Sequence, residues 1–191
     1  MLYSFIGGVA MFTREVNDAI YLRMLSARDA DALFSLTDNS RSYLRKWLSW
    51  LDDTMSADDS LQYIKHTFYA YNNRQGIHAG IFYYGELVGV VAYHRLDYTN
   101  RIGAIGYWLG EEFQGKGIMT EAVSSIVTYG FEGLRLNRIE IRVAPENTAS
   151  RAIPERLRFT EEGRLRQTEK LYDTYVDHII YSMLAEEWKV K

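Results

Sequence analysis

The stretch GEEFQGKGIMTEA, residues 110–122, joins an apolar run to an amphipathic segment. It begins G-x-x-x-x-G-K-G, one residue away from the phosphate-binding loop of nucleotide triphosphatases. Those enzymes need Ser or Thr directly after the lysine to hold Mg²⁺, and that position here is Gly117. The preceding strand, AIGYWLG, also belongs to a predicted antiparallel run. A triphosphatase loop is therefore not expected.

The same loop is suited to bind an anion without a metal. Gly115 and Gly117 allow a tight turn and leave backbone N–H groups uncovered. A helix predicted over Met119–Leu134 begins at once, so its unpaired N–H groups and positive dipole end face the same point. Strand, glycine turn and helix start together favour a pyrophosphate site. A turn that uses glycine only to bend would show the same local pattern.

Composition limits the classes of protein that this chain can represent. It has 191 residues, of which 47% are apolar and 25% charged, as in an ordinary globular protein. We expect one domain over residues 12–191, preceded by a flexible extension over residues 1–11. Cysteine is absent, which excludes a thiolate nucleophile or a thiolate metal site and suits a cytoplasmic location. The four histidines form no i, i+4 pair, so no metal is expected.

Charge and hydropathy argue against two kinds of partner. The net charge is −3 and no Lys/Arg cluster forms a stripe, so direct nucleic acid binding is not expected. No apolar run approaches the length of a membrane span, so no membrane partner is expected either. The weakly acidic balance is compatible with a cationic substrate, and the aromatic content is compatible with a homodimer.

Hydrophobic periodicity and turn residues predict one domain that mixes strands and helices. Helix starts are expected at Ser26–Asp29 and Ser56–Asp59, where Ser precedes an acidic residue by three positions. Gly85-Glu86 is the expected turn of a hairpin. The aromatic segment 43–51 is read either as a core-packing helix-loop or as a wall of a substrate cleft. A further helix is predicted over Thr148–Leu157, and a strand is expected to begin at Phe159. The other predicted strands are Ile20–Leu25, Ala79–Tyr84, Leu87–Leu96, Ile102–Leu109, Arg138–Val143 and Asp177–Leu184.

Two more motifs follow the glycine loop at a fixed separation. A strand, NRIEIRV, leads into Asn147-x-x-Ser150 and then into Leu157-x-Phe159. Together with Gln114–Ala122, these motifs resemble the GNAT superfamily of acetyl-CoA-dependent N-acetyltransferases. Within it the chain is similar to the RimJ/RimL-like branch of ribosomal-protein N-terminal acetyltransferases. The resemblance covers the chain from about Ile20 onward. It implies a single-domain GNAT fold of the α/β (α+β) class, with a mixed, mostly antiparallel central sheet flanked by helices.

Three positions depart from the family pattern. Glu112 stands where Gln or Arg is usual, so its carboxylate should point away from the phosphates. Arg158 replaces the glycine of the Leu-Gly-Phe exit, and a left-handed Arg costs about 1 kcal/mol, so a different turn is expected there. Pro154 lies inside the predicted helix and removes its bond to the Ser150 carbonyl, so a kink is expected.

The resemblance also implies a site and a direct transfer of acetyl from acetyl-CoA to an amine. The backbone of Gly106–Leu109 would bind the pantetheine arm, and Asn147 would cap the helix and contact that arm. Ser150 would protonate the departing thiolate, and Glu169 would act on the amine through water. The predicted cofactor-binding residues are Tyr107, Trp108, Leu109, Gln114, Gly115, Lys116, Gly117, Ile118, Met119, Asn147 and Ser150.

Each candidate also has a plain structural interpretation. Ser150 is typical of the first turn of a helix, and Glu169 lies in a polar run where a solvated acid is common. Glu140 is a second candidate base, although on a strand it can face away. The histidines, at positions 66, 78, 94 and 178, are interpreted as surface or structural residues.

Three functions stay open on the sequence. The first is acetylation of a protein N-terminal amine, with ribosomal proteins as one class of acceptor. The second is acetylation of a polyamine, amino acid or antibiotic amine. The third is an acyl-CoA sensor that binds the cofactor without turnover.

Overall fold

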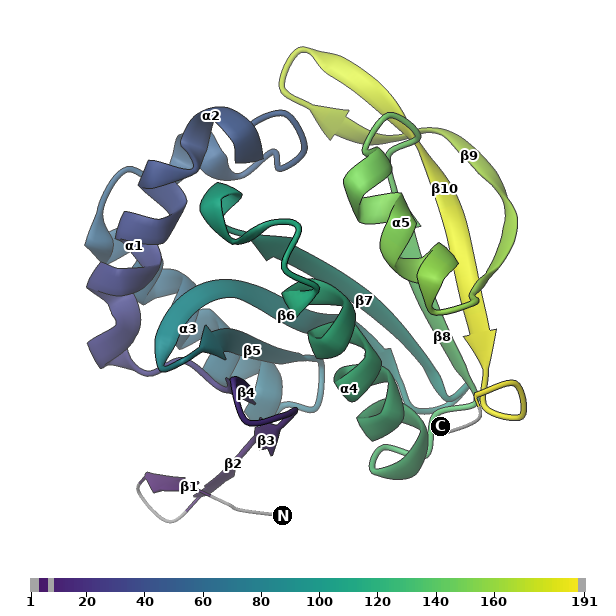
Figure 1. Cartoon of the computed structure of the whole chain (residues 1–191), viewed down its shortest axis with the longest axis horizontal. Coiled ribbons are helices and arrows are strands. Elements are labelled where there is room, and N and C mark those ends of the chain that lie inside the picture. Colours follow the sequence, from purple (N-terminus) through teal and green to yellow (C-terminus); the bar gives the residue numbers. More distant parts are fainter. Residues whose placement is uncertain (1–3, 7–8, 189–191) are drawn as a thin grey trace.

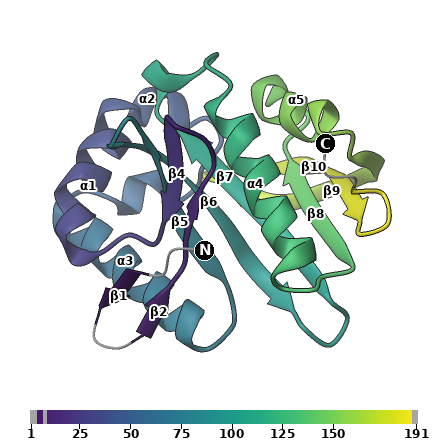
Figure 2. The ribbon, with the colours of Figure 1, turned by 60° about the horizontal axis from the view of Figure 1, so that its bottom comes forward.

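The central feature of the structure is a strongly twisted sheet with helices on both faces (Figures 1 and 2). The computed structural model describes residues 4–6 and 9–188. The strands are β1 (Ser4–Ile6), β2 (Val9–Met11), β3 (Thr13–Glu15), β4 (Ile20–Arg23), β5 (Ile77–Tyr83), β6 (Glu86–Asp97), β7 (Ile102–Leu109), β8 (Arg138–Val143), β9 (Thr160–Leu171) and β10 (Thr174–Leu184). The α-helices are α1 (Ala30–Asn39), α2 (Arg41–Leu44), α3 (Ala57–Asn72), α4 (Ile118–Glu132) and α5 (Thr148–Arg156).

The order of the eight strands in the main sheet is β3-β4-β5-β6-β7-β8-β10-β9. Every neighbouring pair is antiparallel except β7 and β8, which run parallel. This confirms the predicted mixed, mostly antiparallel sheet. The β7–β8 pairing covers only Ile102 to Ile105 against Arg138 to Ile141. Beyond Ile105 the two strands separate, so the second half of β7 has a free edge towards β8.

Helices α1 and α3 cover one face of the sheet, and α4 and α5 cover the other (Figures 1 and 2). Helix α4 is buried along the predicted apolar stripe, because residues at three- and four-residue spacing face the sheet. Both expected helix starts are present. The Ser56 Oγ accepts the backbone N–H of Asp59, and Ser26 and Asp29 form a capping box at a short 3₁₀ turn before α1.

The hairpin between β5 and β6 turns one residue earlier than predicted. Its two central residues are Tyr84 and Gly85, with φ of 49° and 87°, while Glu86 already pairs with Tyr83. Two positive φ values are typical of the type I′ turn, whose twist matches the flanking strands. The predicted pair Gly85-Glu86 was therefore wrong by one position. The position of the turn follows from the pairing register of β5 and β6, which cannot be read from the sequence pattern.

The end of α5 keeps the left-handed turn despite Arg158. This residue has φ of 62°, and its N–H bonds the Glu155 carbonyl at 3.0 Å. The Phe159 N–H bonds the Pro154 carbonyl at 2.9 Å, which completes the usual glycine-type helix ending. The expectation of a different turn was wrong, because two backbone bonds and the buried Phe159 hold the conformation. The helix runs through Pro154 as one element.

The first residues of the chain that belong to the hydrophobic core lie at the end of β2 and directly after it. Met11 and Phe12 are buried in the hydrophobic core, and Phe12 packs edge-on against Tyr129. The predicted flexible extension lies partly outside the described residues, and for the rest it stays a prediction. In the described part of the chain, no helix has the length and apolar character needed to cross a membrane.

Candidate active site

The gap between β7 and β8 opens into a cavity of about 520 Å³. Its walls come from the free half of β7, the glycine loop, the start of α4, helix α5 and residues 43–48, which we call the α2 segment. Figure 1 labels these helices and this strand. The predicted cofactor-binding residues that line it are Tyr107, Trp108, Leu109, Gln114, Gly115, Gly117, Ile118, Met119, Asn147 and Ser150. Motifs about 40 positions apart in the sequence therefore meet in one place.

The glycine loop forms one end of this cavity. Gly115 and Gly117 have φ of 73° and 77°, and a Cβ on either would meet no atom within 4 Å. Gly117 is the N-cap of α4, so the first N–H groups of this helix face the same space. The Nε2 atom of Gln114 is buried in the wall without a hydrogen-bond partner among the described residues. Open backbone donors and an unpaired amide suit an anionic ligand with further acceptor atoms.

Lys116 is the one predicted cofactor-binding residue that does not line the cavity. Its ammonium group lies 5.1 Å from the centre of the Phe113 ring. Positive charge comes instead from Arg156 at the end of α5, whose guanidinium donates to Thr120 Oγ1 at 2.9 Å across the cavity. Glu112 is exposed and does not line the cavity, whereas Glu121 in the first turn of α4 does line it.

Helix α5 presents Ser150 to the cavity. Asn147 caps the helix by accepting the Ser150 N–H at 3.2 Å, as predicted for this residue. The Ser150 carbonyl accepts a hydrogen bond from the Tyr107 hydroxyl at 2.9 Å. Both main-chain polar groups of Ser150 are thus held by residues that also line the cavity.

Four residues of the α5 wall were not among the predicted site residues. Ala149, Ala152, Ile153 and Arg156 all line the cavity. Their spacing of three and four residues is the signal that could have found them, because it places them on one helical face with Asn147 and Ser150 nearby. Small alanines at two of these positions leave the cavity open.

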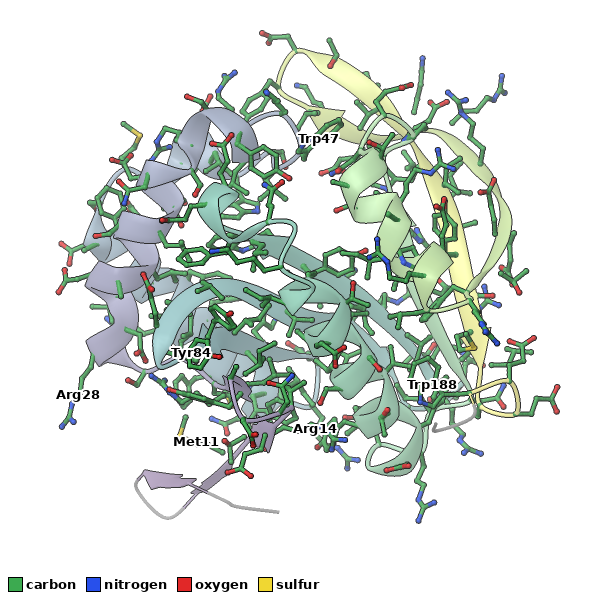
Figure 3. All side chains as sticks on the ribbon, viewed as in Figure 1. Met11, Arg14, Arg28, Trp47, Tyr84 and Trp188 are labelled. Carbon is green, nitrogen blue, oxygen red and sulfur yellow. The ribbon has the colours of Figure 1, made fainter. Side chains whose placement is uncertain are left out.

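A second cavity of about 490 Å³ lies on the opposite side of β7, between the sheet and helices α1 and α3. It shares Leu48, Tyr107 and Trp108 with the first cavity. Trp50 lines it and lies 6.0 Å from Trp108, ring centre to ring centre. Trp47 lines the first cavity and Trp50 the second, which fits the interpretation of the Trp47–Trp50 segment as a cleft wall. Figure 3 shows Trp47 on the segment that follows α2.

Three polar groups of the second cavity lie on α3 and β5. The Ser60 Oγ is buried and has no hydrogen-bond partner among the described residues. The Tyr63 hydroxyl lies 3.0 Å from His78 Nδ1. Burial, with smaller contributions from His94 and His66, lowers the pKa of His78 to about 4, so this ring is neutral at pH 7.

His78 and His94 were both interpreted as surface or structural residues, yet both line this cavity. His94 lies at a β-bulge in β6, between the paired residues Tyr93 and Arg95, and its ring lies over Gly106. Partial burial and the cations of Arg142 and Arg95 lower the pKa of His94. No motif in the sequence signals this placement, which depends on the bulge.

The two candidate bases lie elsewhere. Glu169 lies on β9 outside both cavities, and its carboxylate is 2.8 Å from His178 Nε2. Glu140 forms ion pairs with Arg138 and Arg142 at 2.9 and 3.2 Å. Although partial burial opposes ionisation, these two cations lower the pKa of Glu140. A carboxylate held in that way is a weak proton acceptor, so Glu140 is the poorer candidate.

The tip of the β9–β10 hairpin lies beside the α2 segment (Figure 1) and contacts it. The Tyr172 hydroxyl donates to the Leu48 carbonyl at 2.7 Å, and the Arg45 guanidinium lies 3.9 Å from the Tyr172 ring centre. Leu48 lines both cavities, so this contact holds one residue of the wall that they share. In the described part of the chain, no group of three or more His, Asp or Glu side chains could hold a metal ion.

Comparison with known proteins agrees with this geometry. Residues 19–160 match the model of the acetyltransferase (GNAT) domain family. The chain is 41% identical over 180 residues to YdaF of Bacillus subtilis (strain 168), named as a candidate ribosomal N-acetyltransferase, with 94% of this chain and 98% of that protein covered.

Two solved structures share the fold over most of their length. The microcin C7 self-immunity acetyltransferase MccE, in complex with acetyl-CoA and AMP, has a TM-score of 0.85 and 32% identity, covering 88% of this chain and 94% of that one. The ribosomal L7/L12 alpha-N-protein acetyltransferase RimL, in complex with coenzyme A, has a TM-score of 0.87 and 26% identity, covering 91% and 98%. The fold, the glycine loop at the start of α4 and the family match together show that this chain belongs to the GNAT family of acetyltransferases.

Proposed function

We propose that this enzyme transfers the acetyl group of acetyl-CoA to the N-terminal α-amino group of a protein, with ribosomal proteins as the first class to test. The observation that carries the proposal is the pair of cavities that meet at Tyr107 and Trp108. The first cavity has backbone N–H groups and an arginine that suit a pyrophosphate. The surface of the second cavity is mostly apolar. A donor and an acceptor can therefore approach the same point of β7 from opposite sides.

The residues of the first cavity fit acetyl-CoA. The uncovered N–H groups at Gly115, Gly117 and the start of α4 suit the pyrophosphate, and Arg156 adds positive charge. The free backbone edge of β7 suits the amides of the pantetheine arm. When bound, acetyl-CoA supplies an activated acyl group as a thioester. The relatives RimL and MccE bind coenzyme A or acetyl-CoA in their structures, which supports the same role here.

Two side chains are proposed to handle protons. Ser150 lines the first cavity beside β7 and would donate its hydroxyl proton to the departing thiolate sulfur, after which solvent returns a proton to it. Glu169 is the proposed base and would accept a proton from the amine through water. An α-amino group has an ordinary pKa of about 8, so a remote carboxylate that acts through water suffices.

The second cavity favours an acceptor with a single positive charge. Among the described residues that line it, Asp53 is the one carboxylate, and the histidine at its base, His78, is neutral. Polyamines and aminoglycosides carry several ammonium groups, which several carboxylates would be needed to pair. An N-terminal α-amino group brings one ammonium group, which matches the single carboxylate of this lining better.

The deciding experiment measures acetyl-CoA consumption with four kinds of acceptor: peptides with free N-termini, the same peptides with blocked N-termini, polyamines and aminoglycosides. We expect turnover with free N-termini alone and a mass increase on the first residue. Faster turnover with a polyamine or aminoglycoside would favour the small-molecule function. Tight coenzyme A binding without turnover on any amine would favour the sensor.

Two variants test the proton transfers. Ser150→Ala is expected to lower kcat about tenfold or more, with Ser124→Ala on α4 as the matched control. Glu169→Gln is expected to lower kcat most strongly below pH 8, where the amine is protonated, with exposed Glu186→Gln as its control. Full turnover by either variant at saturating substrate would remove that residue from the mechanism.

A further inference from the structure

The Tyr107 hydroxyl makes a hydrogen bond that crosses the opening of the sheet. It donates to the carbonyl oxygen of Ser150 at 2.9 Å, although the two residues are 43 positions apart. Tyr107 lies two residues beyond Ile105, where the pairing of β7 with β8 ends. The bond therefore joins β7 to α5 where the sheet itself no longer connects the two halves of the molecule.

Pro154 explains why the Ser150 carbonyl needs a donor from outside its helix. In an α-helix this carbonyl would accept the N–H of residue 154, four positions on. Proline has no N–H, so the helix leaves the carbonyl without its regular partner. An unpaired carbonyl in a partly buried position costs free energy, and the Tyr107 hydroxyl takes the place of the missing donor.

We infer that Tyr107 is a positioning residue that holds Ser150 at the angle needed to reach the leaving thiolate. The inference rests on the proposed role of Ser150. Two contacts orient the Ser150 backbone, namely the Asn147 side chain on its N–H and the Tyr107 hydroxyl on its carbonyl. Both residues also line the first cavity, and the Tyr107 bond ties α5 to the free half of β7.

The Tyr107 hydroxyl has no free proton to offer the reaction, because that proton is already donated to the carbonyl. Burial raises the pKa of this hydroxyl above its ordinary value, which makes it a poorer acid still. Its effect on turnover must therefore pass through the geometry of α5. A small displacement of a proton donor is enough to slow a reaction substantially.

A double-mutant cycle tests this inference, because Pro154→Ala restores the helix N–H that Tyr107 replaces. Tyr107→Phe alone should lower kcat about tenfold while the KM for acetyl-CoA changes less than about twofold. In the Tyr107→Phe/Pro154→Ala variant, kcat should return to within about threefold of Pro154→Ala alone. Tyr83→Phe, which removes a hydroxyl on β5, is the matched control and should keep wild-type kcat.

The possible outcomes separate this inference from the proposed role of Ser150. The positioning role of Tyr107 would be overturned if Tyr107→Phe lowered kcat by the same factor with and without Pro154→Ala. Wild-type kcat in a folded Tyr107→Phe variant would also overturn it. The same cycle repeated on Ser150→Ala should show no further loss of kcat from Tyr107→Phe if the tyrosine acts through that serine. Wild-type turnover by Ser150→Ala itself would instead reject the serine as the proton donor. Circular dichroism and Tm confirm that each variant is folded.

Discussion

The two cavities on either side of β7 are similar in volume but are built in different ways. The first draws most of its polar groups from two short stretches, residues 114–119 and 147–156. The second is lined by residues scattered over α1, the segment 48–54, α3, β5, β6 and β7. A ligand with a fixed chemical structure can be bound by a local motif. A cavity assembled from many separate elements has no such local signature in the sequence.

The largest expected effect tests whether the first cavity holds acetyl-CoA. Gly117→Trp places a side chain at φ of 77° in front of the α4 N-terminus, so coenzyme A affinity should fall more than about 100-fold. Isothermal titration calorimetry with coenzyme A measures the change. Gly85→Trp is the matched control, because Gly85 has φ of 87° and equally open space in a remote hairpin. Equal affinity in both variants would contradict the loop assignment.

The second prediction concerns the neutral histidine at the base of the second cavity. The pKa of His78 is about 4 in the folded protein and near 6.5 when unfolded, so the unfolded chain binds the extra proton between these values. Stability contributed by neutral His78 is therefore present above pH 6.5 and declines as pH falls towards 4. By pH 5 the loss should reach about 2 kcal/mol.

Urea unfolding of wild type and His78→Gln from pH 8 to pH 5 checks this expectation. The variant should lose less stability over that range, whatever its stability at pH 8. Exposed His66→Gln controls for the removal of a histidine, and it should keep most of the wild-type pH dependence because His66 is the smallest contributor to the lowered pKa of His78. Parallel curves for wild type and His78→Gln would show that the ring is not held neutral by burial.

Two alanine-to-leucine substitutions, one in each cavity, test which substrate each cavity binds. Ala92→Leu narrows the second cavity and should raise the KM for the amine about tenfold, while acetyl-CoA KM changes less than about twofold. Ala152→Leu narrows the first cavity and should show the reverse pattern. Steady-state kinetics with each substrate varied in turn provides all four values. If both variants raised the same KM, the two cavities would not bind separate substrates.

The smallest expected effect concerns the helix that forms one wall of the first cavity. Arg158 is exposed and left-handed at the end of α5, so Arg158→Gly should raise the free energy of unfolding by about 1 kcal/mol. Acetyl-CoA KM should stay unchanged, because the turn already has its final shape. Lys170→Gly, in the exposed backbone of β9, should destabilise the protein and serves as the control. Thermal denaturation measures both.

Much of the fold could be predicted because its signals are local. Ser56 and Asp59 mark a helix start by their spacing, and the stripe on α4 marks its buried face. The hairpin turn was misplaced by one residue because strand register depends on which residues pair, and Tyr84 itself gives no sign of its positive φ. The turn at Arg158 was also misjudged, since Phe159 and two backbone bonds outweigh the strain of a non-glycine residue.

The sequence by itself determined the family and the first cavity. The motifs at Gln114–Met119 and Asn147–Ser150 have a shape set by backbone bonds within a few residues, so their spacing was sufficient. Only the tertiary structure decided the second cavity, the placement of His78 and His94 in it, and the bond from Tyr107 to Ser150. These contacts join residues far apart in the chain, and their existence depends on how β7 separates from β8 and how the helices pack on each face.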